Sequence, residues 1–198
     1  MSGREARPAQ SARPAVPCLP DTVIPVDATT ALTAFDVADA PALVAAVADA
    51  DIRRWLPLPR PYPVELAEQW VTVGAESIRV SAAGLVRCIR VDGALGGCID
   101  VKRVDWRART AELGYWLAPG FRWRGLASAA VRTLSSWLLG VHSFERVELR
   151  VATGNAASAR VQSRAGFVHE GVARNAGFTD DGRVDLAVWS RIAGDESD

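Results

Sequence analysis

Residues 112–127, ELGYWLAPGFRWRGLA, join the end of a strand to the start of a helix. The strand pattern ends in a proline-glycine pair, which favours a turn. Apolar residues then recur at three- and four-residue spacing over residues 124–140, which predicts an amphipathic helix. The connecting loop carries Arg122, Arg124 and Gly125. These three residues decide how the rest of the chain is interpreted.

The loop has the features of a phosphate-binding site. A helix N-terminus offers unpaired backbone N–H groups and the positive end of the helix dipole, which attract anions. Gly125 permits a ligand to approach the backbone closely, and each arginine can donate charge-assisted bonds of about 1.5–3 kcal/mol. Residues 122–164 hold seven arginines against two glutamates, a net charge of +5. Neither a GxxxxGK[ST] loop nor a GxGxxG motif is present.

Outside this stretch, helical and strand patterns follow one another without repeats. Asp92-Gly93 between two apolar runs is a strong hairpin signal. The predicted elements are helices at 39–55, 64–74, 124–140 and 155–166, and strands at 85–91, 94–104, 110–117, 146–151, 168–173 and 184–192, with an optional first strand at 23–26.

The sequence resembles the GNAT superfamily of acyl-CoA-dependent N-acyltransferases. Arg122-x-x-Gly125-x-Ala127 looks like the pyrophosphate-binding signature of that superfamily. Further motifs resemble its RimJ/RimL branch, whose founders acetylate the N-termini of ribosomal proteins. They are Gly114-Tyr115-Trp116-Leu117, Asn155-x-x-Ser158, Ala165-Gly166-Phe167, Glu170-Gly171, and Gly182-Arg183 with Asp185. The resemblance is strong over residues 112–192 and looser in the N-terminal half. It implies an α+β (mixed α/β) fold with a mostly antiparallel sheet of about six or seven strands and about four flanking helices.

The resemblance also implies roles for individual residues, with acetyl-CoA as co-substrate and no metal. Glu112 stands where several family members place a general base, and Ser158 where the RimL type places the proton donor to the leaving thiolate. Trp116 and Leu117 resemble bulge positions whose backbone pairs with the pantetheine arm. The other implied cofactor-binding residues are Arg122, Trp123, Arg124, Gly125, Leu126, Ala127, Asn155 and Ser158.

Two positions depart from the family pattern. Trp123 replaces a residue that is often glycine, and Gln162 replaces the tyrosine that many members carry seven residues after the asparagine. A plainer interpretation also stays open for two site residues. Glu112 could only pair with an arginine at 107 or 109, and Asn155 could only cap its helix.

The acceptor is predicted to be an amine of low pKa. Deprotonating an α-amine at pH 7 costs about 1–1.4 kcal/mol, against roughly 4.6 for a lysine side chain. A protein or peptide N-terminus is therefore preferred. A small-molecule amine, such as an antibiotic or polyamine, and a non-catalytic acyl-CoA-binding regulatory module remain alternatives. Trp55 and Trp106 are candidates for the acceptor side, whereas Trp70 and Trp137 sit at core positions of helices.

Composition limits the class of protein. Twenty-three basic and 23 acidic residues give no net charge, which argues against nucleic-acid binding, and no apolar run is long enough to span a membrane. Three cysteines without paired spacing favour a reduced, cytoplasmic setting. Residues 1–20, rich in proline, alanine and arginine, are predicted to be a flexible leader before one domain at 21–193 and a tail at 194–198. A homodimer is left open.

Overall fold

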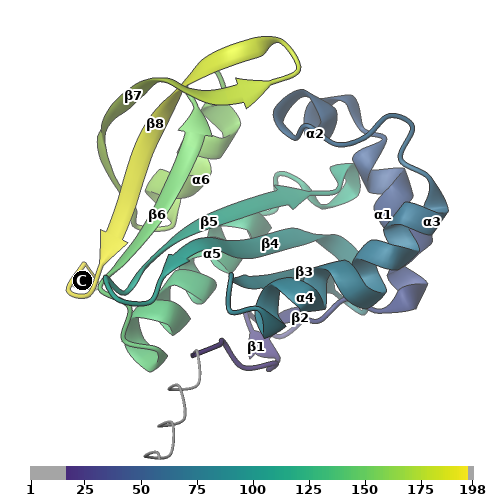
Figure 1. Cartoon of the computed structure of the whole chain (residues 1–198), viewed down its shortest axis with the longest axis horizontal. Helices are drawn as coiled ribbons and strands as arrows, with labels where there is room; N and C mark the ends of the chain where they lie inside the picture. The colour runs from purple at the N-terminus through teal and green to yellow at the C-terminus, as the bar shows by residue number, and fades with distance from the viewer. Residues whose placement is uncertain (1–16, 196–198) are drawn as a thin grey trace, which may run out of the picture.

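A computed structural model describes residues 17–195 of the chain. Its centre is one sheet of eight strands in the order β1-β2-β3-β4-β5-β6-β8-β7 (Figure 1). All neighbouring strands are antiparallel except β5 and β6, which are parallel. The strands are β1 (Ile24–Pro25), β2 (Thr30–Thr33), β3 (Leu85–Val91), β4 (Ala94–Asp105), β5 (Thr110–Leu117), β6 (Arg146–Ala152), β7 (Val168–Thr179) and β8 (Gly182–Ile192).

Helices cover the two faces of the sheet unequally. The face of β3 and β4 that carries Cys88 and Cys98 packs under α1 (Ala40–Val47), α3 (Val64–Gln69), η2 (Trp70–Gly74) and α4 (Ala75–Val80). The opposite face forms the main core with α5 (Leu126–Ser136) and η4 (Trp137–Val141). The short helix α2 (Ala50–Trp55) and α6 (Ala156–Arg164) flank the strand ends, and η1 (Val37–Asp39) and η3 (Pro119–Phe121) are single turns.

The parallel strands β5 and β6 separate halfway along their length. Their pairing runs from Thr110 opposite Arg146 to Leu113 opposite Leu149 and goes no further. Beyond that point β5 continues toward η3 while β6 diverges toward α6, as Figure 1 shows. The last four residues of β5, 114–117, therefore have no strand partner on the β6 side, and of their backbone groups the Leu117 carbonyl accepts a hydrogen bond from Arg122 instead.

Most of the predicted elements are confirmed, with differences at their ends. The hairpin at Asp92-Gly93 forms, with Val91 opposite Ala94. The helix predicted over 39–55 is two helices, because Asp49 caps a new start with its side chain on the Ile52 N–H. Strand β2 was not predicted, and β7 and β8 extend past their predicted ends through register shifts. No helix within residues 17–195 is long and apolar enough to cross a membrane.

The packed part of the chain begins before residue 21. Leu19 is 1% exposed and belongs to the main core. The carbonyls of Leu19 and Pro20 accept hydrogen bonds from Arg79 and Arg87. The predicted flexible leader is therefore wrong for residues 17–20. Its remainder, 1–16, lies outside the described residues, as does most of the predicted tail at 196–198.

Candidate active site

A cavity of about 630 Å³ lies where β5 and β6 separate. It is bounded by the end of β5, the loop after η3, the first turns of α5 and α6, and α2. The lining residues are Asp51, Ile52, Trp55, Tyr115, Trp116, Leu117, Arg122, Trp123, Gly125, Leu126, Ala127, Ser128, Gly154, Asn155, Ala156, Ala157, Ser158, Arg160, Val161 and Arg164. Nine of the eleven implied cofactor-binding and catalytic residues, all except Glu112 and Arg124, line it.

The first turn of α5 faces this cavity with free hydrogen-bond donors. No side chain caps the helix, and its N-cap Gly125 has φ +79° in the left-handed region. Nothing lies within 4 Å of a Cβ built at Gly125, so a ligand has room beside the backbone. Trp123 also has a left-handed backbone, φ +66°, and its side chain is 86% exposed. Glycine would take this conformation without strain.

Arg122 and Arg124 of the loop have different contacts. Arg122 donates to Asp49 at 2.5 Å, to Asp51 at 3.1 Å and to the carbonyl of Leu117 at 3.2 Å. Its guanidinium therefore links the loop to the start of α2, and its predicted contact with a phosphate stays a prediction. Arg124 is exposed, and its guanidinium carbon lies 5.7 Å from the centroid of the Phe121 ring.

A matched pair of substitutions separates these two roles. We expect Arg122→Gln to lower the free energy of unfolding by about 1 kcal/mol, because it breaks one partly buried ion pair, with Asp49, and one exposed pair, with Asp51. We expect Arg124→Gln to leave stability unchanged and to weaken acetyl-CoA binding several-fold. Urea denaturation and calorimetric titration measure the two effects. Unchanged stability in Arg122→Gln together with lost binding would contradict this assignment.

Two hydroxyl groups meet at the inner part of the cavity. Asn155 caps α6 by accepting the Ser158 N–H at 3.0 Å, which fixes the first turn of the helix. The Ser158 Oγ lies 2.6 Å from the Tyr115 hydroxyl, which reaches across from β5. Burial raises the pKa of Tyr115 to about 12, so this phenol stays protonated at neutral pH. It can then donate to Ser158 Oγ and leave the serine proton free for another acceptor.

Sequence reasoning did not identify Tyr115 as a functional residue. The position seven residues after the asparagine, Gln162, is 1% exposed and does not line the cavity. A tyrosine from β5 thus supplies a hydroxyl beside Ser158 that the helix itself lacks. Arg160 and Arg164 were also missed, although their four-residue spacing places them on one face of α6.

The backbone at Trp116 and Leu117 is accessible for a reason other than the predicted bulge. The register between β4 and β5 runs without a shift from Gly97 opposite Leu117 to Lys102 opposite Glu112. The predicted bulge at these residues is therefore wrong. The strand end faces the cavity because β6 has diverged from it.

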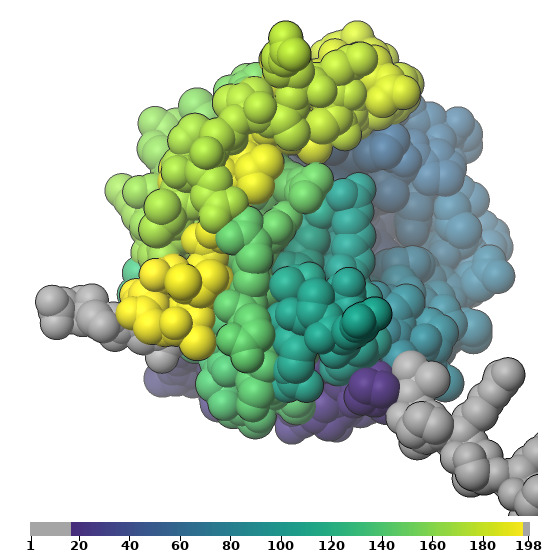
Figure 2. All heavy atoms as spheres, turned by 60° about the vertical axis from the view of Figure 1, so that its left-hand side comes forward, coloured from purple at the N-terminus to yellow at the C-terminus, as the bar shows by residue number. Residues whose placement is uncertain are grey.

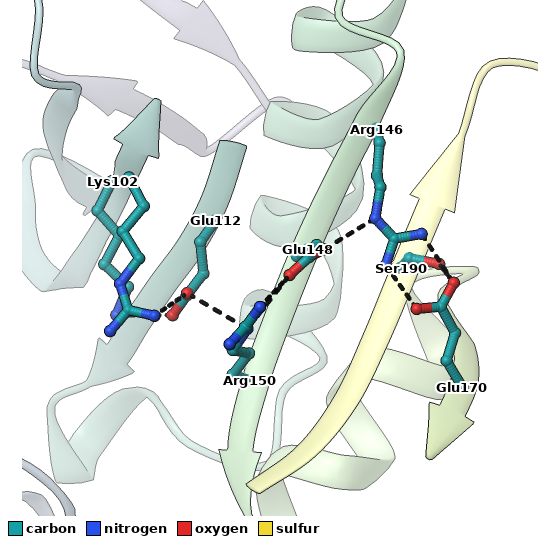
Figure 3. Close-up of polar contacts among 8 residues, drawn as sticks. Lys102, Glu112, Arg146, Glu148, Arg150, Glu170 and Ser190 are labelled. Carbon is teal, nitrogen blue, oxygen red and sulfur yellow. Dashed lines mark hydrogen bonds and ion pairs between the residues drawn. The ribbon is translucent and has the colours of Figure 1, made fainter. Parts of the chain in front are cut away.

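Glu112 lies outside the cavity lining, within the paired part of β5. Its carboxylate is 7% exposed and contacts Arg103 at 3.0 Å, Lys102 at 3.4 Å and Arg150 at 3.7 Å. Figure 3 shows that this cluster continues across the sheet through Glu148, Arg146 and Glu170 to Ser190. The expected partners at 107 and 109 are not among its ion pairs. A general-base role for Glu112 stays a prediction, and three cations compete with a substrate ammonium for this carboxylate.

The helix α2 borders the cavity, and the segment after it contacts the β7–β8 hairpin. Trp55 lines the cavity, and its ring lies 3.6 Å from a Cβ built at Gly154. Arg60, after α2, pairs with Asp180 at the hairpin tip. Figure 2 shows the same junction, where the yellow-green hairpin meets the blue N-terminal helices. Trp106 does not line the cavity, because its indole N–H donates to the Ala82 carbonyl and its ring packs on Phe144.

The cysteines and acidic residues show no arrangement for a metal. No group of three or more His, Cys, Asp or Glu side chains within residues 17–195 could hold an ion. Cys88 and Cys98 are buried, as predicted, and burial raises the pKa of the Cys88 thiol to about 12. Such a thiol is unreactive at neutral pH.

Comparison with known proteins agrees with this geometry. The chain is 35% identical over 109 residues to the "Putative ribosomal N-acetyltransferase YdaF" of Bacillus subtilis, covering 55% of this chain and 60% of that protein. It is 31% identical over 114 residues to the L-amino acid N-acetyltransferase AaaT of Escherichia coli, covering 54% and 67%. The fold resembles RimL, a ribosomal L7/L12 alpha-N-protein acetyltransferase solved with coenzyme A, with a TM-score of 0.80, 23% identity, and coverage of 88% of this chain and 100% of that one.

The match to the acetyltransferase (GNAT) domain family extends over residues 30–168. This range contains the loop with Arg122, Arg124 and Gly125, the separated strands and both hydroxyl groups of the cavity. The chain therefore belongs to the acetyltransferase (GNAT) domain family.

Proposed function

We propose that the protein is an N-acetyltransferase that moves an acetyl group from acetyl-CoA to an α-amine. One observation carries the proposal. A single cavity combines the uncapped N-terminus of α5, which suits a phosphate, with the Tyr115–Ser158 hydroxyl pair, which suits a leaving thiolate.

The residues present fit the parts of acetyl-CoA. The N–H groups of Leu126, Ala127 and Ser128 in the first turn of α5 would hold the pyrophosphate, with Arg124 nearby. Arg160 and Arg164 on α6 add positive charge at the cavity wall for a further phosphate. The unpaired backbone at the end of β5 suits the amide groups of the pantetheine arm. When bound, acetyl-CoA supplies an activated acyl carbon.

The chain's own groups would then position and complete the transfer. The end of β5 holds the thioester beside the two hydroxyls, which orients it for attack. Ser158 donates its hydroxyl proton to the sulfur as the carbon–sulfur bond breaks. Tyr115 would act through Ser158, because a hydrogen bond donated by its hydroxyl to the Ser158 Oγ, 2.6 Å away, would leave the serine proton to point into the cavity. Tyr115 is thus a positioning residue.

An α-amine is the acceptor that the site favours. It loses its proton near neutral pH at little cost, whereas a lysine side chain costs roughly 4.6 kcal/mol. By their names, YdaF and RimL act on ribosomal proteins and AaaT on L-amino acids. A peptide N-terminus is our first candidate. The match to AaaT makes a free amino acid the second.

A thiol-release assay with acetyl-CoA tests the proposal. The panel contains peptides with free N-termini, the same peptides with blocked N-termini and an internal lysine, and free amino acids. We expect release with free α-amines and none with blocked peptides. Turnover on the lysine peptides alone would contradict the acceptor assignment. Tight acetyl-CoA binding without release on any amine would favour a regulatory binding module.

A further inference from the structure

A second carboxylate lies closer to the cavity than Glu112. Asp100 on β4 stands opposite Gly114 on β5. Its Oδ1 lies 2.6 Å from a Cβ built at Gly114, so the carboxylate occupies the space that any other residue at 114 would fill. Glycine at this position lets the Asp100 carboxylate lean over β5.

The position of Asp100 along the sheet coincides with the separation of the strands. Leu113 is the last residue of β5 paired to β6, and Gly114 is the first beyond it. Trp116 lines the cavity. Along the strand it is two residues, about 7 Å, from Gly114 and four residues, about 13 Å, from Glu112. Because side chains alternate along a strand, Glu112, Gly114 and Trp116 are on one face of the sheet. Tyr115 reaches Ser158 from the opposite face.

The two carboxylates also differ in their partners. Glu112 has three cations within 4 Å. The Asp100 carboxylate makes no hydrogen bond or ion pair with any group within residues 17–195. A half-buried carboxylate without a protein partner has its pKa raised and can reach a ligand, and such groups concentrate at functional sites.

The electrostatic surroundings make Asp100 a stronger proton acceptor than an ordinary aspartate. Burial raises its pKa, Lys102 lowers it in part, and Glu112 raises it again. The other titratable group facing it is Cys98, two residues away on β4. Its neighbour on β3, Val86, is apolar.

We propose that Asp100 is the general base that takes the proton from the acceptor amine. This inference rests on the proposed acetyl transfer. The amine nitrogen forms a bond to the acetyl carbon from the Asp100 face of the sheet, and the carbon–sulfur bond breaks. Asp100 accepts the proton that the nitrogen loses, and Ser158 on the other face donates one to the sulfur. Glu112 holds the surrounding cations and does not touch the substrate.

Isosteric substitution of each carboxylate tests the assignment in the full-length protein. We expect Asp100→Asn to lower kcat/KM about 10²- to 10³-fold with acetyl-CoA affinity unchanged. The matched control Glu112→Gln should lose less than tenfold. On the acid side of the pH profile, log kcat/KM of the wild type should depend on two deprotonations, that of the base and that of the amine. In Asp100→Asn it should depend on the deprotonation of the amine alone. A purely structural role would not change that slope.

Thermal unfolding shows whether a loss of activity reflects misfolding. A carboxyl group with a raised folded-state pKa opposes folding above that pKa, and the effect vanishes as the pH falls below the unfolded value. Asp100→Asn should therefore be at least as stable as the wild type at pH 7, a known pattern at active sites. If the wild type is active and Asp100→Asn keeps full activity or the same pH slope, the role of Asp100 is refuted and the proposed function is not. A wild type that acetylates no amine would refute the proposed function itself.

Discussion

Replacing Gly125 by aspartate is expected to weaken acetyl-CoA binding at least about 100-fold while the protein stays folded. The new carboxylate would stand at the α5 N-cap, where the pyrophosphate is proposed to lie. Two like charges 5 Å apart repel by about 3 kcal/mol at an effective dielectric constant of 20, which corresponds to roughly 100-fold in affinity. The open space beside Gly125 lets the side chain enter without a clash. Calorimetric titration with acetyl-CoA measures the loss.

Asparagine at the same position is the matched control. It has the same shape, tolerates the left-handed backbone better than most residues, and carries no charge. Gly125→Asn should therefore lose far less affinity than Gly125→Asp. Aspartate is also a good N-cap and interacts favourably with the helix dipole, so Gly125→Asp should not unfold more easily than Gly125→Asn. Equal losses of affinity in both variants would show that backbone strain, and not charge, disrupts the loop.

The parts of the fold that sequence could predict are those set by local signals. Asp92-Gly93 specifies its hairpin through backbone conformations that few other pairs adopt. The helix after Gly125 follows from its apolar spacing. Strand β2, by contrast, has four residues with two threonines, too short a pattern to separate from a loop. It forms because it pairs with β3, nearly sixty residues away, and local sequence does not encode that partner.

The same division applies to the candidate site. The loop and the α6 cap were predictable because each is a local motif, and the structure places both at one cavity. The ion pair of Arg122 with Asp49 was not predictable, because the two residues lie 73 positions apart in the sequence. Nor was the Tyr115–Ser158 contact, which spans 43 positions and depends on β5 and β6 separating. Asp100 escaped notice because only the register of β4 on β5 places it over Gly114.

Loss of the Ser158 hydroxyl is expected to lower kcat about 10²- to 10³-fold, because the thiolate would then leave without a proton donor. Acetyl-CoA affinity should hold in Ser158→Ala, since the backbone N–H that Asn155 caps is unchanged. Tyr115→Phe should cost about tenfold, the worth of one oriented hydrogen bond. Steady-state kinetics with the best α-amine, together with acetyl-CoA titration, measures these effects.

The double variant decides whether the two hydroxyls work in series. If Tyr115 acts only by directing the Ser158 proton, removing the phenol from a protein that already lacks the serine hydroxyl changes nothing further. Ser158→Ala/Tyr115→Phe should then match Ser158→Ala in kcat, a strongly non-additive result. Multiplied losses in the double variant would instead mean that Tyr115 protonates the sulfur by itself. In that case the phenol from β5 would replace the tyrosine that the α6 helix lacks at Gln162.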